Sequence, residues 1–90
     1  MTRNEANLYL ATVLTTLAEM PRHEAPEGHL YMALQHAGCN LEDFYGVKSI
    51  LVDGGLVTAE MGPQLKLTAK GKELADDINA KLAAVKQEVR

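Results

Sequence analysis

The segment from Gly54 to Ile78, GGLVTAEMGPQLKLTAKGKELADDI, limits the fold of this chain more than any other. Two short β-prone runs, Leu56–Glu60 and Leu65–Leu67, flank a Gly62-Pro63 turn, and the second run leads directly into a helical pattern. Glycine tolerates the backbone angles of a turn, and proline removes an amide donor where strand pairing ends. The segment therefore predicts a β-hairpin followed at once by a helix, whose N-cap we expect at Thr68.

Three helical patterns precede this hairpin, and their expected ranges are about residues 2–20, 26–37 and 40–53. Thr2 and Glu5 have the spacing of a capping box, and Pro21 is expected to stop the first helix. Asn40 is a favourable N-cap for the third helix. We interpret residues 22–25, between the first two helices, as a polar link.

Apolar residues recur at intervals of three and four in these helices, which predicts their buried faces. The expected inward-facing residues are Leu10, Val13, Leu14, Leu17, Leu30, Ala33, Leu34, Ala37, Phe44, Val47, Ile50 and Leu51. Four leucines are expected to close the core over the third helix, namely Leu56, Leu65, Leu67 and Leu74. Gly71 is expected where a side chain would collide with a neighbouring backbone. The alternative is a tolerated helix glycine, which costs about 1 kcal/mol.

Two passages resemble those of bacterial transcriptional regulators of the MarR and PadR type. Leu51–Val57 is similar to the passage L-x-x-x-G-L-[VI] that enters the first wing strand, and Leu65–Leu74 is similar to the passage L-x-L-T-x-x-G-x-x-L that leaves the wing. The resemblance implies a single winged helix-turn-helix domain over residues 1–90, mainly α with a small β-hairpin. It places the wing at about residues 56–68 and an extended C-terminal helix at about residues 69–89.

The resemblance also implies DNA binding, with the third helix in the major groove and the wing on the backbone. Lysine and arginine supply much of the affinity of such proteins because they neutralise phosphates. The residues expected to contact DNA are Tyr45, Lys48, Ser49, Gln64, Lys66, Lys70 and Lys72. The first three would read the groove from the third helix, and the last three lysines would hold the backbone.

The charge of the chain departs from this family pattern. The net charge is −3, but residues 1–65 carry −5 and residues 66–90 carry +2. A helical projection of the third helix places Glu42, Tyr45, Gly46, Ser49, Val52 and Asp53 outward, with Lys48 on the flank. We therefore expect DNA binding to be weak or assisted by a partner. The alternative is a winged-helix module for protein–protein interaction that does not bind DNA.

The last helix carries an apolar seam that continues beyond what a small domain needs. Steps of three and four residues join Ala75, Ile78, Leu82, Val85 and Val89. This spacing predicts a homodimer through the last helix, with a contribution from Leu8 of the first helix. The alternative is that Ile78 and Leu82 cover the first helix of the same chain.

Other classes of function have little support in the sequence. His29, His36 and Cys39 are three soft ligands without a fourth or a C-x-x-C pair, so we expect no metal site and no cofactor. Ser49 is the only serine and lacks a glycine elbow, and no phosphate-binding glycine loop is present, so we expect no enzyme. A single cysteine and the lack of a long apolar run suggest a cytoplasmic protein without a membrane span or a signal peptide.

Overall fold

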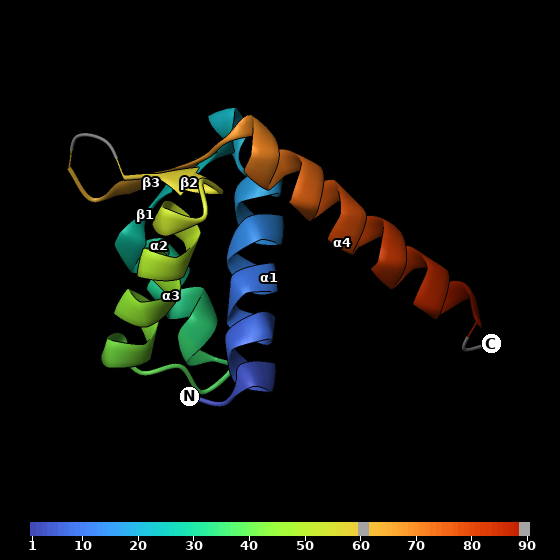
Figure 1. Cartoon of the computed structure of the whole chain (residues 1–90), viewed down its shortest axis with the longest axis horizontal. Coiled ribbons are helices and arrows are strands. Elements are labelled where there is room, and N and C mark those ends of the chain that lie inside the picture. The colour runs from blue at the N-terminus through green and yellow to red at the C-terminus, as the bar shows by residue number, and fades with distance from the viewer. Residues whose placement is uncertain (60–61, 89–90) are drawn as a thin grey trace.

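The structure is a computed structural model that describes the backbone of residues 1–59 and 62–88 and the side chains of residues 1–59 and 62–83 (Figure 1). The described part is mainly helical and contains a small antiparallel sheet. Its elements are α1 (Arg3–Glu19), a 3-10 turn (Pro21–His23), β1 (Glu24–Pro26), α2 (Glu27–Gln35), α3 (Leu41–Asp53), β2 (Val57–Thr58), β3 (Gln64–Leu67) and α4 (Ala69–Glu88).

Side-chain caps define the beginnings of three helices, as the sequence predicted. Thr2 and Glu5 form a reciprocal capping box, because each side chain accepts the backbone N–H of the other, at 3.1 and 3.0 Å. Asn40 Oδ1 accepts the N–H of Asp43 at 2.8 Å at the start of α3. Thr68 Oγ1 accepts the N–H of Gly71 at 3.0 Å at the start of α4. These bonds satisfy amides that have no partner within the helix.

The sheet has three strands in the order β1-β3-β2. The predicted hairpin accounts for β2 and β3, but β1 was not predicted. β1 pairs with β3 through Ala25 and Leu65, and β2 pairs with β3 through Val57 and Leu67. The supposed polar link at residues 22–25 thus ends in a strand. A strand of three residues is too short to display the alternation that identifies strands in a sequence.

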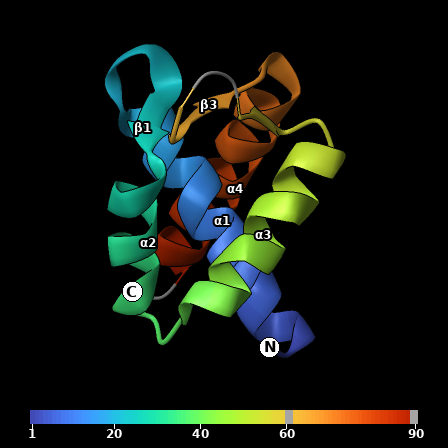
Figure 2. The same ribbon diagram turned by 90° about the vertical axis from the view of Figure 1, so that its left-hand side faces the viewer.

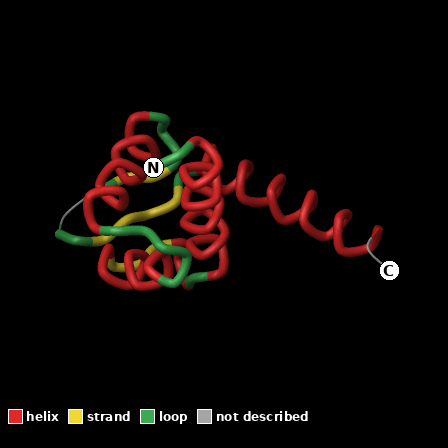
Figure 3. Tube along the Cα trace, turned by 90° about the horizontal axis from the view of Figure 1, so that it is seen from below, coloured by secondary structure: helices red, strands yellow, loops and turns green. Residues whose placement is uncertain are grey.

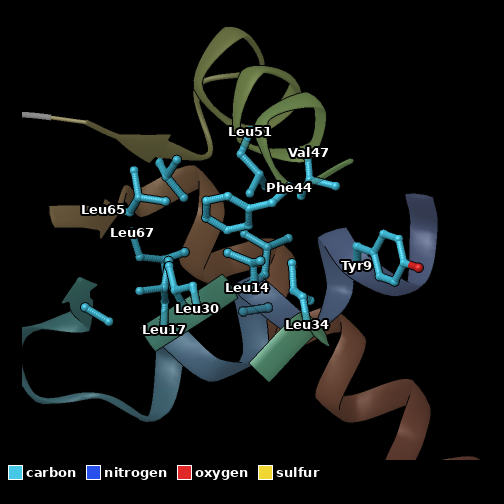
Figure 4. Packing of buried hydrophobic residues seen from close by; sticks show 14 of the residues in the cluster. Tyr9, Leu14, Leu17, Leu30, Leu34, Phe44, Val47, Leu51, Leu65 and Leu67 are labelled. Atoms are coloured by element: carbon cyan, nitrogen blue, oxygen red, sulfur yellow. The ribbon is translucent and has the colours of Figure 1, made fainter. Parts of the chain in front are cut away.

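The hydrophobic core surrounds α1, which lies between α2 and α3 in Figure 2. Figure 4 shows the side chains of Phe44, Val47 and Leu51 pointing from α3 into this core. Tyr9 is completely buried, although the helical spacing did not identify it. The buried hydrophobic residues are Tyr9, Val13, Leu14, Leu17, Ala25, Leu30, Leu34, Cys39, Phe44, Val47, Leu51, Val57, Leu65, Leu67 and Ala75.

Some of the expected core positions were wrong. Ile50 is 46% exposed, because the buried face of α3 is narrow and follows Phe44, Val47 and Leu51. Leu74 is 39% exposed, so it does not close the core. Ala37 is exposed as well, because α2 ends at Gln35, earlier than expected.

Gly71 joins the hairpin to α4, and the expected collision at this position is confirmed. A Cβ atom on Gly71 would lie 2.9 Å from Leu67 Cδ1 and still closer to the carbonyl oxygen of Leu56. The same carbonyl accepts the N–H of Thr68 at 3.0 Å, and the Thr68 hydroxyl donates to the neighbouring Gly55 carbonyl at 2.6 Å, with the Leu56 oxygen as a more distant acceptor at 3.1 Å. Because these bonds hold the carbonyl in place, only glycine fits without a shift of the backbone.

The first part of α4 packs against α1, and the remainder projects away from the other elements (Figures 1 and 3). This projection explains the elongated shape, with principal extents of 44 × 27 × 20 Å. No helix in the described part of the chain is both long and apolar enough to cross a membrane.

Candidate interaction surface of α3 and the β2–β3 hairpin

The burial of one side of α3 determines which of its side chains face outward. Phe44, Val47 and Leu51 are buried, so the opposite side of the helix carries exposed residues. Tyr45 and Ser49 are exposed there, as the helical projection predicted. The other exposed residues of that projection are Glu42, Val52 and Asp53, whereas Gly46 is half-buried.

A hollow of about 290 Å³ lies on this outward side of α3, beside the end of β2. Its lining residues are Tyr45, Lys48, Ser49, Val52, Asp53 and Ala59. The structure therefore brings together the three α3 residues that the sequence analysis assigned to groove reading. Ala59, which follows β2, was not expected in this site.

Lys48 forms an ion pair with Glu27, the first residue of α2. The Nζ atom of Lys48 donates to Oε1 of Glu27, and the two side chains are 27% and 22% exposed. Lys48 was predicted on the flank of α3, but its partner, 21 residues earlier in the chain, was not predicted. The pair neutralises the only lysine or arginine between His23 and Gly62.

The other residues expected to contact DNA lie outside this hollow. Gln64 and Lys66 are exposed on β3, where they pair with Pro26 and Glu24 of β1. Lys70 donates from Nζ to the carbonyl oxygen of Gly54, at 3.1 Å, at the C-terminus of α3. A cation is favourable there because the helix dipole and the last carbonyls are negative. Lys72 is exposed on the first turn of α4.

A stripe of exposed residues, apolar apart from Ser49, runs along the outward side of α3. We name this set Leu41, Tyr45, Ser49 and Val52 the α3 stripe, because steps of four, four and three place its members on one side of a helix. Leu41 is 48% exposed, Tyr45 is 52% exposed and Val52 is 38% exposed. Leu41 was not predicted as a site residue, although it lies four residues before Tyr45 in the sequence.

Acidic residues border the α3 stripe. Glu42 and Asp53 are both exposed and lie on the outward side of the helix. The segment from His23 to Gly62 has a net charge of −5. Because Lys48 is paired with Glu27, the surface around the stripe is acidic as well as apolar.

A larger and shallower hollow of about 570 Å³ lies at the start of α4. Its lining residues are Leu56, Lys70, Glu73, Leu74, Asp76 and Asp77. Three acids and one lysine are among these residues, and none of them lines the α3 hollow. Binding at this second hollow therefore serves as a control for non-specific attraction of cations to acidic residues.

Cys39 belongs to the core and is only 4% exposed. Burial, with a smaller contribution from the negative charge of Asp43, raises the pKa of its thiol. His29 and His36 are exposed. Among the side chains that the structure describes, those of residues 1–59 and 62–83, no group of three or more from His, Cys, Asp or Glu could hold a metal ion.

The residues expected at a dimer interface differ in exposure. Leu8 and Leu82 are both 52% exposed, and Ile78 is half-buried against the core. Ala75 is completely buried within its own chain and has no surface to offer a partner, so we remove it from the expected interface. The side chains of Val85 and Val89 lie outside the described residues.

Comparisons with protein-family models, with curated proteins and with solved structures give no match to this chain.

Proposed function

We propose that the chain is a winged-helix protein of the regulator type. Three helices are followed by a β-hairpin and a further helix, which is the element order of that class. The pairing of β1 with β3 adds a third strand at the base of the hairpin. In this proposal α2 and α3 are the helix-turn-helix pair, and the β2–β3 hairpin is the wing.

We further propose that the surface of α3 and the wing binds another protein and does not bind DNA. The ion pair between Lys48 and Glu27 carries this proposal, because the only base on α3 is already neutralised. DNA affinity depends largely on cations that replace the counterions of phosphates. An acidic surface with exposed Tyr45 and Val52 instead offers apolar contacts, which are typical of protein interfaces.

The test is a fluorescence anisotropy titration of a labelled random duplex at several salt concentrations. We expect no binding, even at low salt, where the electrostatic contribution is strongest. A control variant, Glu27→Gln, removes the acid that neutralises Lys48. Binding of the unmodified protein with a steep salt dependence would contradict the proposal.

DNA binding is the second candidate function, and the exposed Lys66 and Lys72 near the wing base favour it. Combined substitution of Lys66, Lys70 and Lys72 with alanine should abolish any binding of random duplex under this candidate. Because each phosphate contact contributes about 0.9 to the salt slope, the loss of three contacts is measurable. Affinity that survives the triple substitution would exclude these lysines as the phosphate contacts.

We also propose that the protein forms a homodimer through α4 with a contribution from α1. The support is the exposure of Leu8 and Leu82 and the projection of α4 away from the rest of the chain (Figure 3). Isolated helices have only marginal stability in water, so burial of the exposed apolar side of α4 against a partner would stabilise this helix. Sedimentation equilibrium should give a dimer for the unmodified protein and a monomer for Leu82→Asp. Ala80→Asp, on the opposite side of α4, should remain a dimer.

A further inference from the structure

We propose that the α3 stripe docks a basic amphipathic helix of another protein, an inference that rests on the proposed protein-binding function of this surface. Two independent observations point to this partner. One is the shape and apolar character of the stripe and its hollow. The other is the negative charge along the borders of the stripe.

The length of the stripe suits a short helix. Leu41 and Val52 are eleven residues apart, which corresponds to roughly 16 Å along a helix axis. A partner helix of about three turns covers that distance. Tyr45 lies between these two residues, is 52% exposed, and its ring is tilted against that of Phe44 with centroids 6.0 Å apart. Large aromatic side chains at the centre of an interface commonly contribute most of its binding energy.

The hollow beside the stripe has room for an apolar anchor. It has a volume of about 290 Å³ and lies between Tyr45, Val52 and Ala59. A leucine or methionine of the partner fits this position, and the polar lining residues are Ser49, Asp53 and Lys48, the last of which is paired with Glu27. Such an anchor in a groove is how amphipathic helices are generally recognised.

The charges around the stripe favour a basic partner. Glu42 and Asp53 are exposed beside the apolar residues, and the charge of Lys48 is offset by Glu27. Lysines or arginines on the polar side of a docked helix would lie near these acids. Complementary charge increases the association rate and excludes acidic competitors.

The sheet offers less to a partner than the helix does. β1 and β2 are the edge strands, and they contain only three and two residues as described. An added strand would form few backbone hydrogen bonds on edges of that length. The chemistry of this surface therefore favours a docked helix over an added strand.

The test uses two synthetic helical peptides of fifteen residues with leucines in steps of three and four. The polar positions are all lysine in one peptide and all glutamate in the other. Each is titrated into the full-length, ¹⁵N-labelled protein, and amide shifts are followed by NMR. We expect the lysine peptide to shift residues of α3 and Ala59, whereas the glutamate peptide causes no shift.

Variants separate specific docking from attraction to any acidic surface. Tyr45→Ser and Val52→Ser should each weaken binding of the lysine peptide about tenfold, which is the usual effect of losing a central apolar anchor. Leu74→Ser is the matched control, because Leu74 is also exposed and lines the acidic hollow of α4. It should leave affinity unchanged. Because all three residues are exposed, circular dichroism should show that the variants fold.

Three results would overturn the inference in distinguishable ways. Equal shifts at Glu73, Asp76 and Asp77 would show that the lysine peptide only follows acidic charge. Binding of the glutamate peptide at α3 would refute the basic partner but leave the protein-binding function standing. Shifts of α3 caused by random duplex DNA, without any by either peptide, would refute the proposed function itself.

Discussion

Replacement of Gly71 by alanine tests whether close packing at the start of α4 holds the hairpin in place. The added methyl group would lie 2.9 Å from Leu67 Cδ1 and closer still to the carbonyl oxygen of Leu56. The leucine side chain can adjust, but the Leu56 carbonyl is held by the N–H of Thr68, and the adjacent Gly55 carbonyl is held by the Thr68 hydroxyl. The hairpin or the first turn of α4 must therefore move.

The expected change in the free energy of unfolding is the balance of one stabilising and two destabilising contributions. Alanine favours a helix over glycine by about 1 kcal/mol. Overpacking costs about 1–3 kcal/mol, and weakening of the bond from the Thr68 N–H to the Leu56 carbonyl adds about 1 kcal/mol. The balance for Gly71→Ala is a loss of roughly 2 kcal/mol in the free energy of unfolding, equivalent to a fall in Tm of about 8–16 °C.

Urea unfolding followed by far-ultraviolet circular dichroism measures this loss, because α1 and α4 dominate the signal. Gly28→Ala is the matched control, since Gly28 is also helical and a Cβ there meets nothing within 4 Å. It should gain about 0.4–1 kcal/mol in the free energy of unfolding. A Gly71→Ala protein as stable as the unmodified one would refute the packing argument.

Three further predictions concern the other contacts described above. Asn40→Ala should cost about 1 kcal/mol of stability in urea unfolding, because the cap of α3 is lost, whereas Asn40→Asp keeps the acceptor and should cost little. Glu27→Gln should change the free energy of unfolding by less than about 1 kcal/mol, since the pair with Lys48 is partly exposed, and a larger loss would contradict that estimate. The raised pKa of the Cys39 thiol makes its stabilising contribution complete below the ordinary thiol pKa of 9.0 and lost as the pH rises above it. Unfolding measured between pH 7.5 and pH 10.5 should therefore show a steeper loss of stability for the unmodified protein than for Cys39→Ala.

The parts of the fold that could be predicted from the sequence are those with local signals. The caps at Thr2, Asn40 and Thr68 depend on residues three positions away, and all three form as predicted. β1 could not be predicted, because it is defined by its pairing with β3, forty residues later along the chain. Ile50 was misjudged because periodicity gives the direction of a buried face but not its width.

The sequence predicted only some members of the candidate site, namely those on α3, and none of its contacts with other elements. Helical projection was sufficient to place Tyr45 and Ser49 on one outward surface. It could not show that Lys48 is paired with Glu27 or that Lys70 binds the carbonyl of Gly54, since both partners come from other elements. These two contacts occupy the charged groups of Lys48 and Lys70, so the charge that the surface presents to a partner differs from the charge expected from its residue types.

Two of the lysines expected to bind DNA already hold α3 within the chain. Lys48 attaches it to α2, and Lys70 binds the carbonyl of Gly54 at its C-terminus. If either lysine moved to a phosphate, the contact within the chain would be lost, so the gain in binding is only the difference between the two interactions. For Lys48 the lost partner is a carboxylate, and Glu27 would be left unpaired and negative beside the DNA. Retention of the Lys48–Glu27 pair therefore opposes DNA binding, whereas a basic helix would meet the exposed acids Glu42 and Asp53 without breaking that pair.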